Sequence, residues 1–405
     1  LIFSQLLQVL FNMADVAVVG KFSSATALGS VGSTSTLVTL FTGFLIGLSN
    51  GINVRVAQYL GARQEEDTRN CVHTALILCT LSGVVIAVLC FFLAAPMLEL
   101  LKTKDDLLHG AVLYFRIYAL GMPALGIFNF GNAVLSASGD TKRPLAYLTA
   151  AGILNVILNL FFVIVCKMAA DGVALASIIS QYLSAVLVLL HMTHLTDSCR
   201  VEWKLLRLRG GEAGRILGLG IPAGIQGAIF SVSNVFIQSG INSFGENAIA
   251  GSSLALNFEY FTYDIANAFA QAAVTFTSQN FGAGDIRRCK RIFRLCLLFG
   301  IVFTEILSAV FMVWDDFFVS IYTSSSAVAV FAVSRMRHVC SLEGLTATYE
   351  VESASLRGMG RSLEPAVFTI LGTVVFRLIW MATVFRLFPT YEMLMNVYPA
   401  SWIFT

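Results

Sequence analysis

The chain contains very little charge. Asp, Glu, Lys and Arg make up 12% of its 405 residues, whereas soluble domains contain about 25%. The net charge is only +2, which gives no indication of a nucleic-acid partner. Hydrophobic residues make up 57%, and the mean hydropathy is +0.79. Such a chain cannot hide its apolar surface in one soluble core, so we expect the lipid bilayer to be its solvent.

The sequence also lacks the motifs of metal and nucleophile chemistry. It contains no HExxH and no GxSxG, and its five histidines lie near the ends of predicted helices rather than in a cluster. The eight cysteines form no CxxC pair, and we expect most of them to pack as small apolar residues. An intramembrane enzyme is therefore disfavoured, and no cofactor is expected.

What the chain does contain is an internal repeat at an offset of 221 residues. The stretch from Gln58 to Ala62 recurs from Gln279 to Ala283, and the stretch from Ala133 to Pro144 recurs from Ala354 to Pro365, both without a gap. Two like halves in an apolar chain of this length predict a transporter built from two similar bundles.

Apolar stretches of about 20 residues predict membrane-spanning helices, so the fold class is an all-α polytopic membrane protein with two six-helix bundles. Gly121 with Pro123, and Gly220 with Pro222, are expected to bend the fourth and seventh helices. The twelfth stretch is expected to be incomplete, because Thr405 falls at the repeat position of Ser184. The predicted helices cover 1–20, 36–60, 72–95, 110–136, 144–167, 171–195, 214–241, 249–279, 290–313, 330–356, 365–388 and 393–405.

The predicted loops differ in charge. Those after even-numbered helices carry 16 Lys and Arg, and those after odd-numbered helices carry five. The positive-inside rule then places the even loops and both termini in the cytoplasm, with the protein in the cytoplasmic membrane of a bacterium. We expect an N-terminal lobe at 1–195, a basic cytoplasmic linker at 196–213 and a C-terminal lobe at 214–405.

Four polar residues of the first half are candidates for a cation-coupling site. Asp15 is costly to bury in a membrane, and Asn155 and Asn159 share one helix face. With the hydroxyl of Ser177, they could hold a proton–water network or a Na⁺ ion, for which Asp15 is the charged ligand. The alternative is that Asn and Ser only join helices by hydrogen bonds.

Comparison of the halves sharpens this hypothesis. A purely architectural role would favour the same residues in both copies, yet the second copy has aromatic residues at all four positions. These either pack or form the wall of a site for flat cations. In order, Asp15, Asn155, Asn159 and Ser177 correspond to Phe236, Phe376, Trp380 and Tyr398.

The second half has charged residues of its own at membrane depth. Glu259, Asp264, Glu350 and Arg377 correspond to uncharged residues of the first half. An ion pair of Glu259 or Glu350 with Arg377 is the structural interpretation. A substrate or ion site formed by these four residues is the functional one.

At these residues the chain resembles the multidrug and toxic compound extrusion family of transporters. The resemblance rests on short stretches spread over the chain: 15–20, 58–62, 278–283, 356–360 and 398–402. It implies two lobes around a central cavity and export of organic cations driven by Na⁺ or H⁺ entry.

The resemblance also implies a first-lobe pocket, onto which Asp15, Asn155, Asn159 and Ser177 map. Asn159 stands where the family usually has Asp, and Ser177 where it usually has Thr. The missing carboxylate favours H⁺ over Na⁺ as the coupling ion.

We expect a monomer whose partners are organic cations and lipid. A flippase for lipid-linked saccharides is the alternative function, and a channel would need a polar stripe that the sequence does not show.

Overall fold

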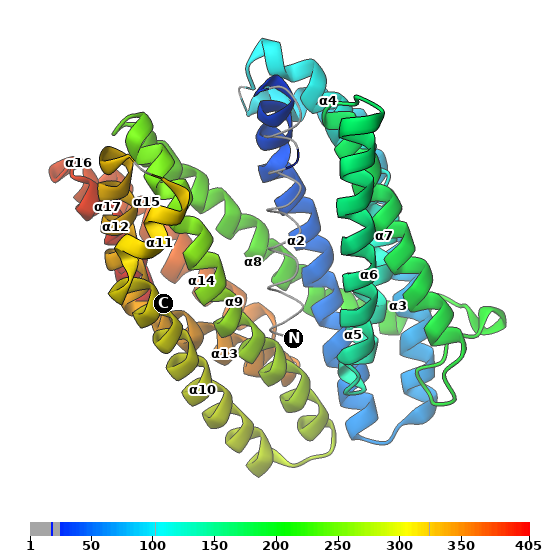
Figure 1. Cartoon of the computed structure of the whole chain (residues 1–405). Helices are drawn as coiled ribbons and strands as arrows, with labels where there is room; N and C mark the ends of the chain where they lie inside the picture. Colours follow the sequence, from blue (N-terminus) through cyan, green and yellow to red (C-terminus); the bar gives the residue numbers. More distant parts are fainter. Residues whose placement is uncertain (1–17, 19–24, 102, 324) are drawn as a thin grey trace. The chain divides into compact units, whose positions relative to one another are not determined.

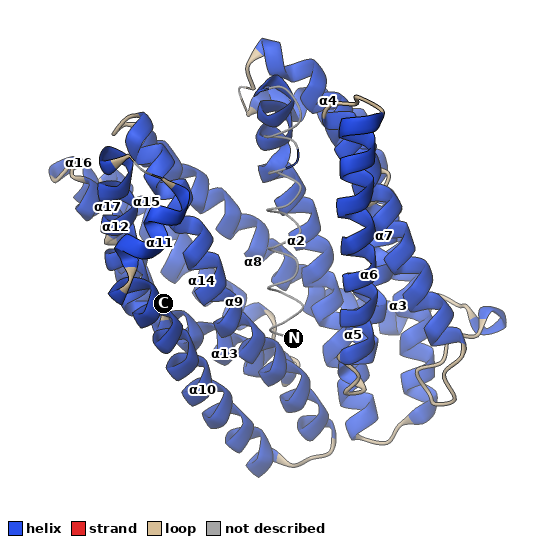
Figure 2. Ribbon diagram, viewed as in Figure 1, coloured by secondary structure: helices blue, strands red, loops and turns tan. Residues whose placement is uncertain are grey.

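The computed structural model describes residue 18 and residues 25–101, 103–323 and 325–405. This part of the chain consists of helices and connecting loops, without strands (Figure 2). Seven of its helices are long and apolar enough to cross a membrane, or eight if one bent pair counts as a single span. The predicted all-α polytopic fold is thus confirmed. Asp15 lies outside the described residues.

The chain divides into two compact units, one extending to Gly224 and the other starting at Ile225 (Figure 1). The boundary lies inside α8, so the lobe limits and the linker expected at 196–213 stay a prediction. The first unit contains α2 (Ala25–Gly61), α3 (Glu65–Leu100), α4 (Asp105–Ala119), α5 (Met122–Ala137), α6 (Lys142–Leu160), the π-helical η1 (Phe161–Val165), α7 (Ala170–Thr193), η2 (Trp203–Leu205) and the beginning of α8 (Gly210–Asn242).

The second unit continues along α8 and ends at Thr405. Its helix α9 packs against α10, α12 and α13, which brings Glu259 of α9 into the interior of this unit. The elements are α9 (Glu246–Gly282), α10 (Ile286–Val313), α11 (Asp315–Tyr322), α12 (Ser326–Val339), η3 (Cys340–Leu342), α13 (Gly344–Gly358), α14 (Leu363–Thr369), the π-helical η4 (Ile370–Val375), α15 (Phe376–Ala382), α16 (Val384–Leu387), α17 (Tyr391–Met395) and α18 (Val397–Phe404).

Two expectations about helix shape had different outcomes. The bend before Pro123 is confirmed, because α4 and α5 meet at 45°. The bend expected at Pro222 stays a prediction, and this residue lies inside the single helix α8. The short helix α11 was not expected from the sequence, because its eight residues are too few for the span pattern.

The repeat is visible in the way equivalent helices end. Gly139 and Gly360, which are 221 residues apart, have φ of +92° and +89°. The residue after each glycine donates its N–H to a carbonyl five residues earlier, at 2.8 and 3.0 Å, which closes the helix end. Arg63 and Gly284 are likewise 221 residues apart, and they have φ of +57° and +76°.

Glycines allow α2 and α8 to approach closely within the first unit. A Cβ atom on Gly47 would lie 2.3 Å from the backbone nitrogen of Gly224, and one on Gly51 would lie 2.6 Å from the carbonyl oxygen of Ile216. Neither backbone can yield, so glycine is required at these positions of α2. Small residues at a spacing of four are the usual means of tight helix packing in membranes.

The segment between α7 and α8 is packed against the first unit. His73 of α3 is buried, and its Nε2 accepts a hydrogen bond from the backbone N–H of Glu202 at 3.0 Å. Cys199 and Val201 belong to the hydrophobic core of this unit. Burial raises the pKa of the Cys199 thiol to about 12, and the nearby Asp197 carboxylate adds to the effect.

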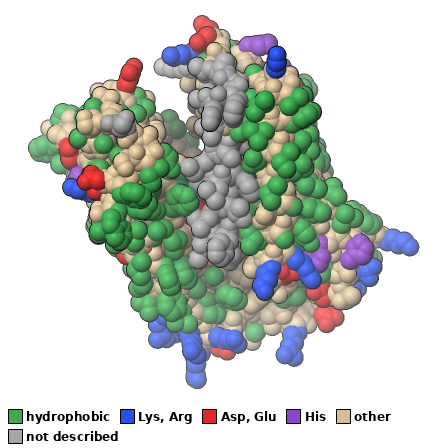
Figure 3. Space-filling view, in the orientation of Figure 1, with side chains coloured by type: hydrophobic (Ala, Val, Ile, Leu, Met, Phe, Trp, Pro, Cys, Tyr) green, Lys and Arg blue, Asp and Glu red, His purple; other side chains and the backbone are tan. Residues whose placement is uncertain are grey.

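The flanks of the helices present apolar side chains, as a lipid environment requires. Figure 3 shows hydrophobic side chains over the helix flanks and Lys and Arg mostly near helix ends. On α3, the exposed apolar side chains include Leu81, Val85, Val88 and Phe92.

Candidate functional site

In the first unit, two of the predicted site residues form one hydrogen-bonded pair. Asn159 is fully buried, and its Nδ2 donates to the Oδ1 of Asn155, one turn earlier on α6, at 3.1 Å. Ser177 is buried on α7, which packs against α6. The π-helical η1 directly follows this part of α6, and π-helical turns often occur at functional sites. How Asp15 lies relative to these three residues stays a prediction.

In the second unit, Glu259 of α9 forms a buried ion pair with Arg335 of α12. Arg335 Nε and Nη2 donate to the two carboxylate oxygens of Glu259 at 2.5 and 2.8 Å. Arg335 is only 1% exposed. Such a bidentate ion pair neutralises both charges. Removing one partner costs several kcal/mol, because the other charge is then left buried and unpaired.

Arg377 of α15 is equally buried but has neutral partners. Its Nε donates to the Ser401 hydroxyl of α18 at 3.1 Å, and its Nη1 donates to the Asn234 Oδ1 of α8 at 3.1 Å. The guanidinium also lies over the ring of Phe230, at 5.0 Å from the ring centre. The structural interpretation of these charges, an ion pair of Arg377 with Glu259 or Glu350, is therefore wrong. Glu259 instead pairs with Arg335 of the facing helix α12.

Tyr398 connects the two buried arginines. The guanidinium carbons of Arg335 and Arg377 lie 5.2 and 4.8 Å from the centre of its ring. The aromatic residue that replaces Ser177 in the second copy thus contacts the protein's own cations. We call the set of Glu259, Arg335, Arg377, Tyr398, Asn234 and Ser401 the arginine cluster.

The other two predicted residues of the second half lie outside the arginine cluster. Glu350 of α13 accepts a hydrogen bond from the Tyr263 hydroxyl at 3.1 Å and lies 4.0 Å from Arg357. Asp264 of α9 has a buried Oδ2 without a hydrogen-bond partner among the described residues. The structure therefore brings Glu259 and Arg377 into one cluster and places Glu350 and Asp264 apart from it.

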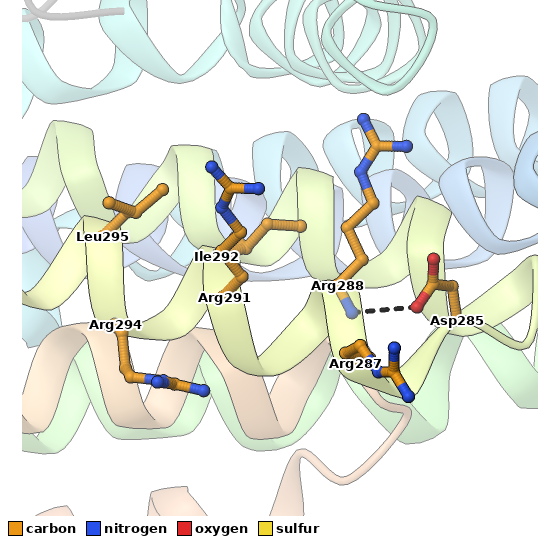
Figure 4. Close-up of a pocket in the computed structure, with 7 residues that line it drawn as sticks. All are labelled: Asp285, Arg287, Arg288, Arg291, Ile292, Arg294 and Leu295. Atoms are coloured by element: carbon orange, nitrogen blue, oxygen red, sulfur yellow. Dashed lines mark hydrogen bonds between the residues drawn. The ribbon is translucent and has the colours of Figure 1, made fainter.

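An open pocket of about 870 Å³ lies at the beginning of α10 (Figure 4). Asp285 accepts a hydrogen bond from the Arg288 backbone N–H at 2.9 Å and so caps the helix. The lining contains none of the predicted site residues. It consists of Asp285, Arg287, Arg288, Arg291, Ile292, Arg294 and Leu295.

Comparison with known protein families identifies the family of this chain. The sequence profile of the MatE family matches residues 1–161 and again residues 222–382. The two matches begin 221 residues apart and end 221 residues apart, so they reproduce the internal repeat. The chain belongs to the MatE family. The resemblance noted in the sequence is thereby confirmed, and the protein is a multi-pass membrane transporter rather than an enzyme.

Curated MatE relatives include two proteins of Bacillus subtilis. The chain is 29% identical to the probable multidrug resistance protein YpnP, over 70% of this chain and 63% of that protein. It is 24% identical to the probable multidrug resistance protein YoeA, over 91% of this chain and 81% of that protein.

Solved MatE structures share the fold. A crystal structure of MATE in complex with MaL6 superimposes with a TM-score of 0.92, at 20% identity, over 99% of this chain and 90% of that one. An outward-facing multidrug resistance MATE family transporter of the MOP superfamily gives 0.89, also at 20% identity, over 100% and 91%.

Sequence reasoning on this MatE protein missed Arg335, although a signal for it existed. Arg335 corresponds to Tyr114 under the repeat, so a charge appears in the second copy where the first has none. The same comparison did single out Glu259 and Arg377, which correspond to Val38 and Val156. Arg335 was overlooked because it stands beside Arg337 in a helix whose charges can be taken for a helix end.

Proposed function

We propose that this MatE protein exports small organic cations across the cytoplasmic membrane in exchange for inward movement of H⁺ or Na⁺. Two conformations of the transporter, one open to each side of the membrane, must differ in their affinity for the coupling ion. Otherwise the gradient of that ion cannot drive export. Family membership and the names of the curated multidrug resistance relatives support this proposal.

The observation that carries the coupling hypothesis is the buried amide pair on α6. Asn159 and Asn155 keep polar groups in the interior of an apolar unit, and Ser177 adds a hydroxyl on α7. Their oxygens are ligands that hard cations and water accept. None of the three titrates, so we assign the change of protonation to Asp15, with H⁺ as the preferred coupling ion.

The names of the curated multidrug resistance relatives favour export of small molecules over the flippase alternative. We keep the cytoplasmic location of both termini and the lobes at 1–195 and 214–405 as part of the proposal, because the basic loops follow the even-numbered helices. A monomer with a lipid-facing apolar surface suffices for this mechanism.

The test is transport by the Asp15→Asn variant in reconstituted liposomes. We expect it to lose ethidium export under an imposed H⁺ gradient, while the matched variant Asp106→Asn, at the exposed beginning of α4, keeps it. Full export by Asp15→Asn would refute the role of Asp15. Export that needs Na⁺ when the pH gradient is collapsed would refute H⁺ coupling.

A further inference from the structure

The arginine cluster contains two positive charges, Arg335 and Arg377, and one negative charge, Glu259. Glu259 neutralises Arg335 through two hydrogen bonds. Arg377 is also 1% exposed, and in the described part of the chain its hydrogen bonds go to the amide of Asn234 and the hydroxyl of Ser401. A buried cation without an anionic partner is expensive, so its presence calls for an explanation.

Glu343 does not provide the missing partner by contact. It is buried between η3 and α13, where it interacts electrostatically with Arg335 and Arg377. It forms no ion pair with either arginine, and its Oε2 has no hydrogen-bond partner among the described residues. Among the described residues, the Arg377 guanidinium is therefore in direct contact with neutral groups, and Glu343 acts on it only from a distance.

The surroundings of Arg377 are those of a recognition site for a flat, acidic group. Phe230 and Tyr398 flank the guanidinium at 5.0 and 4.8 Å from their ring centres, so an aromatic molecule would find stacking surfaces beside the charge. The π-helical η4 ends at Val375, two residues before Arg377, and π-helical turns often occur at functional sites. Four groups from two helices, α8 and α18, thus converge on a cation that α15 carries.

We propose that Arg377 binds an acidic group, a carboxylate or phosphate, on the transported molecule. This proposal rests on the exporter function and adds a preference within its organic cations, for aromatic zwitterions that carry an acidic group beside the cationic one. An anionic oxygen that replaces Asn234 or Ser401 as the acceptor adds an ion pair to the hydrogen bond, and in a desolvated interior this attraction exceeds that of a neutral oxygen for the same guanidinium.

A structural role gives a different expectation. If Arg377 only ties α15 to α8 and α18, then any residue that keeps those hydrogen bonds would serve, and the charge of the ligand would not matter. The two roles are therefore separated by ligands that differ in charge but not in shape.

The test uses the purified full chain in detergent micelles with a rhodamine dye in two forms, the free carboxylate and its methyl ester, and follows dye anisotropy. We expect the wild type to bind the free acid about 10-fold or more tightly than the ester, the preference that a hydrogen bond to a charged group provides. Arg377→Gln should abolish this preference and leave ester binding nearly unchanged, and Arg377→Lys should retain part of it.

Arg337→Gln is the matched control, because Arg337 is 63% exposed and pairs with Asp315 outside the arginine cluster. It should retain the preference for the free acid. Equal wild-type affinity for acid and ester, or a preference that survives Arg377→Gln, would overturn the proposal.

A competition experiment decides the question even if Arg377→Gln fails to fold. On the wild type, benzoate should displace the free-acid dye whereas benzamide, of the same shape but neutral, should not; equal displacement by both, or by neither, would contradict the proposal. Gradient-driven ester export without acid preference would refute this inference alone. Acid preference without any gradient-driven export would refute the exporter function instead.

Discussion

The buried Glu259–Arg335 pair makes a quantitative prediction about the second unit. Glu259→Gln removes the negative charge but keeps the size of the side chain, so Arg335 stays buried and loses its only ion-pair partner in the described part of the chain. Because the pair is bidentate, the amide oxygen of the variant still accepts one hydrogen bond from Arg335, whereas its NH₂ group is a donor and cannot accept the other. Breaking one side of such a pair costs about 3–5 kcal/mol of stability.

The same reasoning gives a smaller effect for the double variant. Glu259→Gln combined with Arg335→Met removes both charges, and it should be more stable than Glu259→Gln alone, since no buried charge is left unpaired. Arg337→Gln is the control, because its pair with Asp315 leaves the arginine 63% exposed. Exposed pairs contribute at most about 1 kcal/mol.

The assay is equilibrium unfolding in detergent micelles, in a background where the other three of the four tryptophans are replaced by Phe. It follows the fluorescence of Trp402, which is buried in the core of the second unit. The expected order of destabilisation is Glu259→Gln first, then the double variant, and last Arg337→Gln. A loss for Glu259→Gln no larger than that for Arg337→Gln would refute the view that this ion pair holds α9 to α12.

Two further predictions concern the first unit. Gly47→Ala should destabilise the protein by about 1–3 kcal/mol, because its Cβ would meet the backbone of Gly224 at 2.3 Å, whereas Gly43→Ala meets nothing within 4 Å and should be tolerated; equal melting temperatures of the two variants in detergent would contradict the close α2–α8 contact. Cys199 should react with maleimide at pH 8 far more slowly than the exposed Cys166, since a pKa of about 12 leaves only about one thiol in ten thousand as thiolate. The two labelling rates are compared in single-cysteine variants. Equal rates would show that the segment before α8 is not packed as described.

Much of the architecture could be predicted from the sequence because it depends on local patterns. Apolar length indicated the helices, and the repeat indicated two like halves, which the double family match and the paired helix ends at Gly139 and Gly360 confirm. The bend at Pro123 follows from the missing N–H of proline. Pro222, in contrast, lies inside the single helix α8.

The partners of buried charges could not be predicted in the same way. Glu259, Arg335 and Arg377 lie on three helices far apart in the sequence, and their pairing depends on how those helices rotate against one another. The π-helical η4 shifts the register just before Arg377, and no residue pattern announces such an inserted turn. In the first unit, the spacing of Asn155 and Asn159 was sufficient, since a hydrogen bond one turn apart needs only a helix.

The central claim, that this MatE protein drives export with an ion gradient, is tested most directly by uphill transport. The measurement is the ethidium concentration on both sides of liposomes that contain the purified protein, before and after an H⁺ gradient is imposed. We predict accumulation of ethidium against its own concentration gradient, which collapses when the H⁺ gradient is dissipated. Movement that stops once the two concentrations are equal, with or without the gradient, would contradict the account.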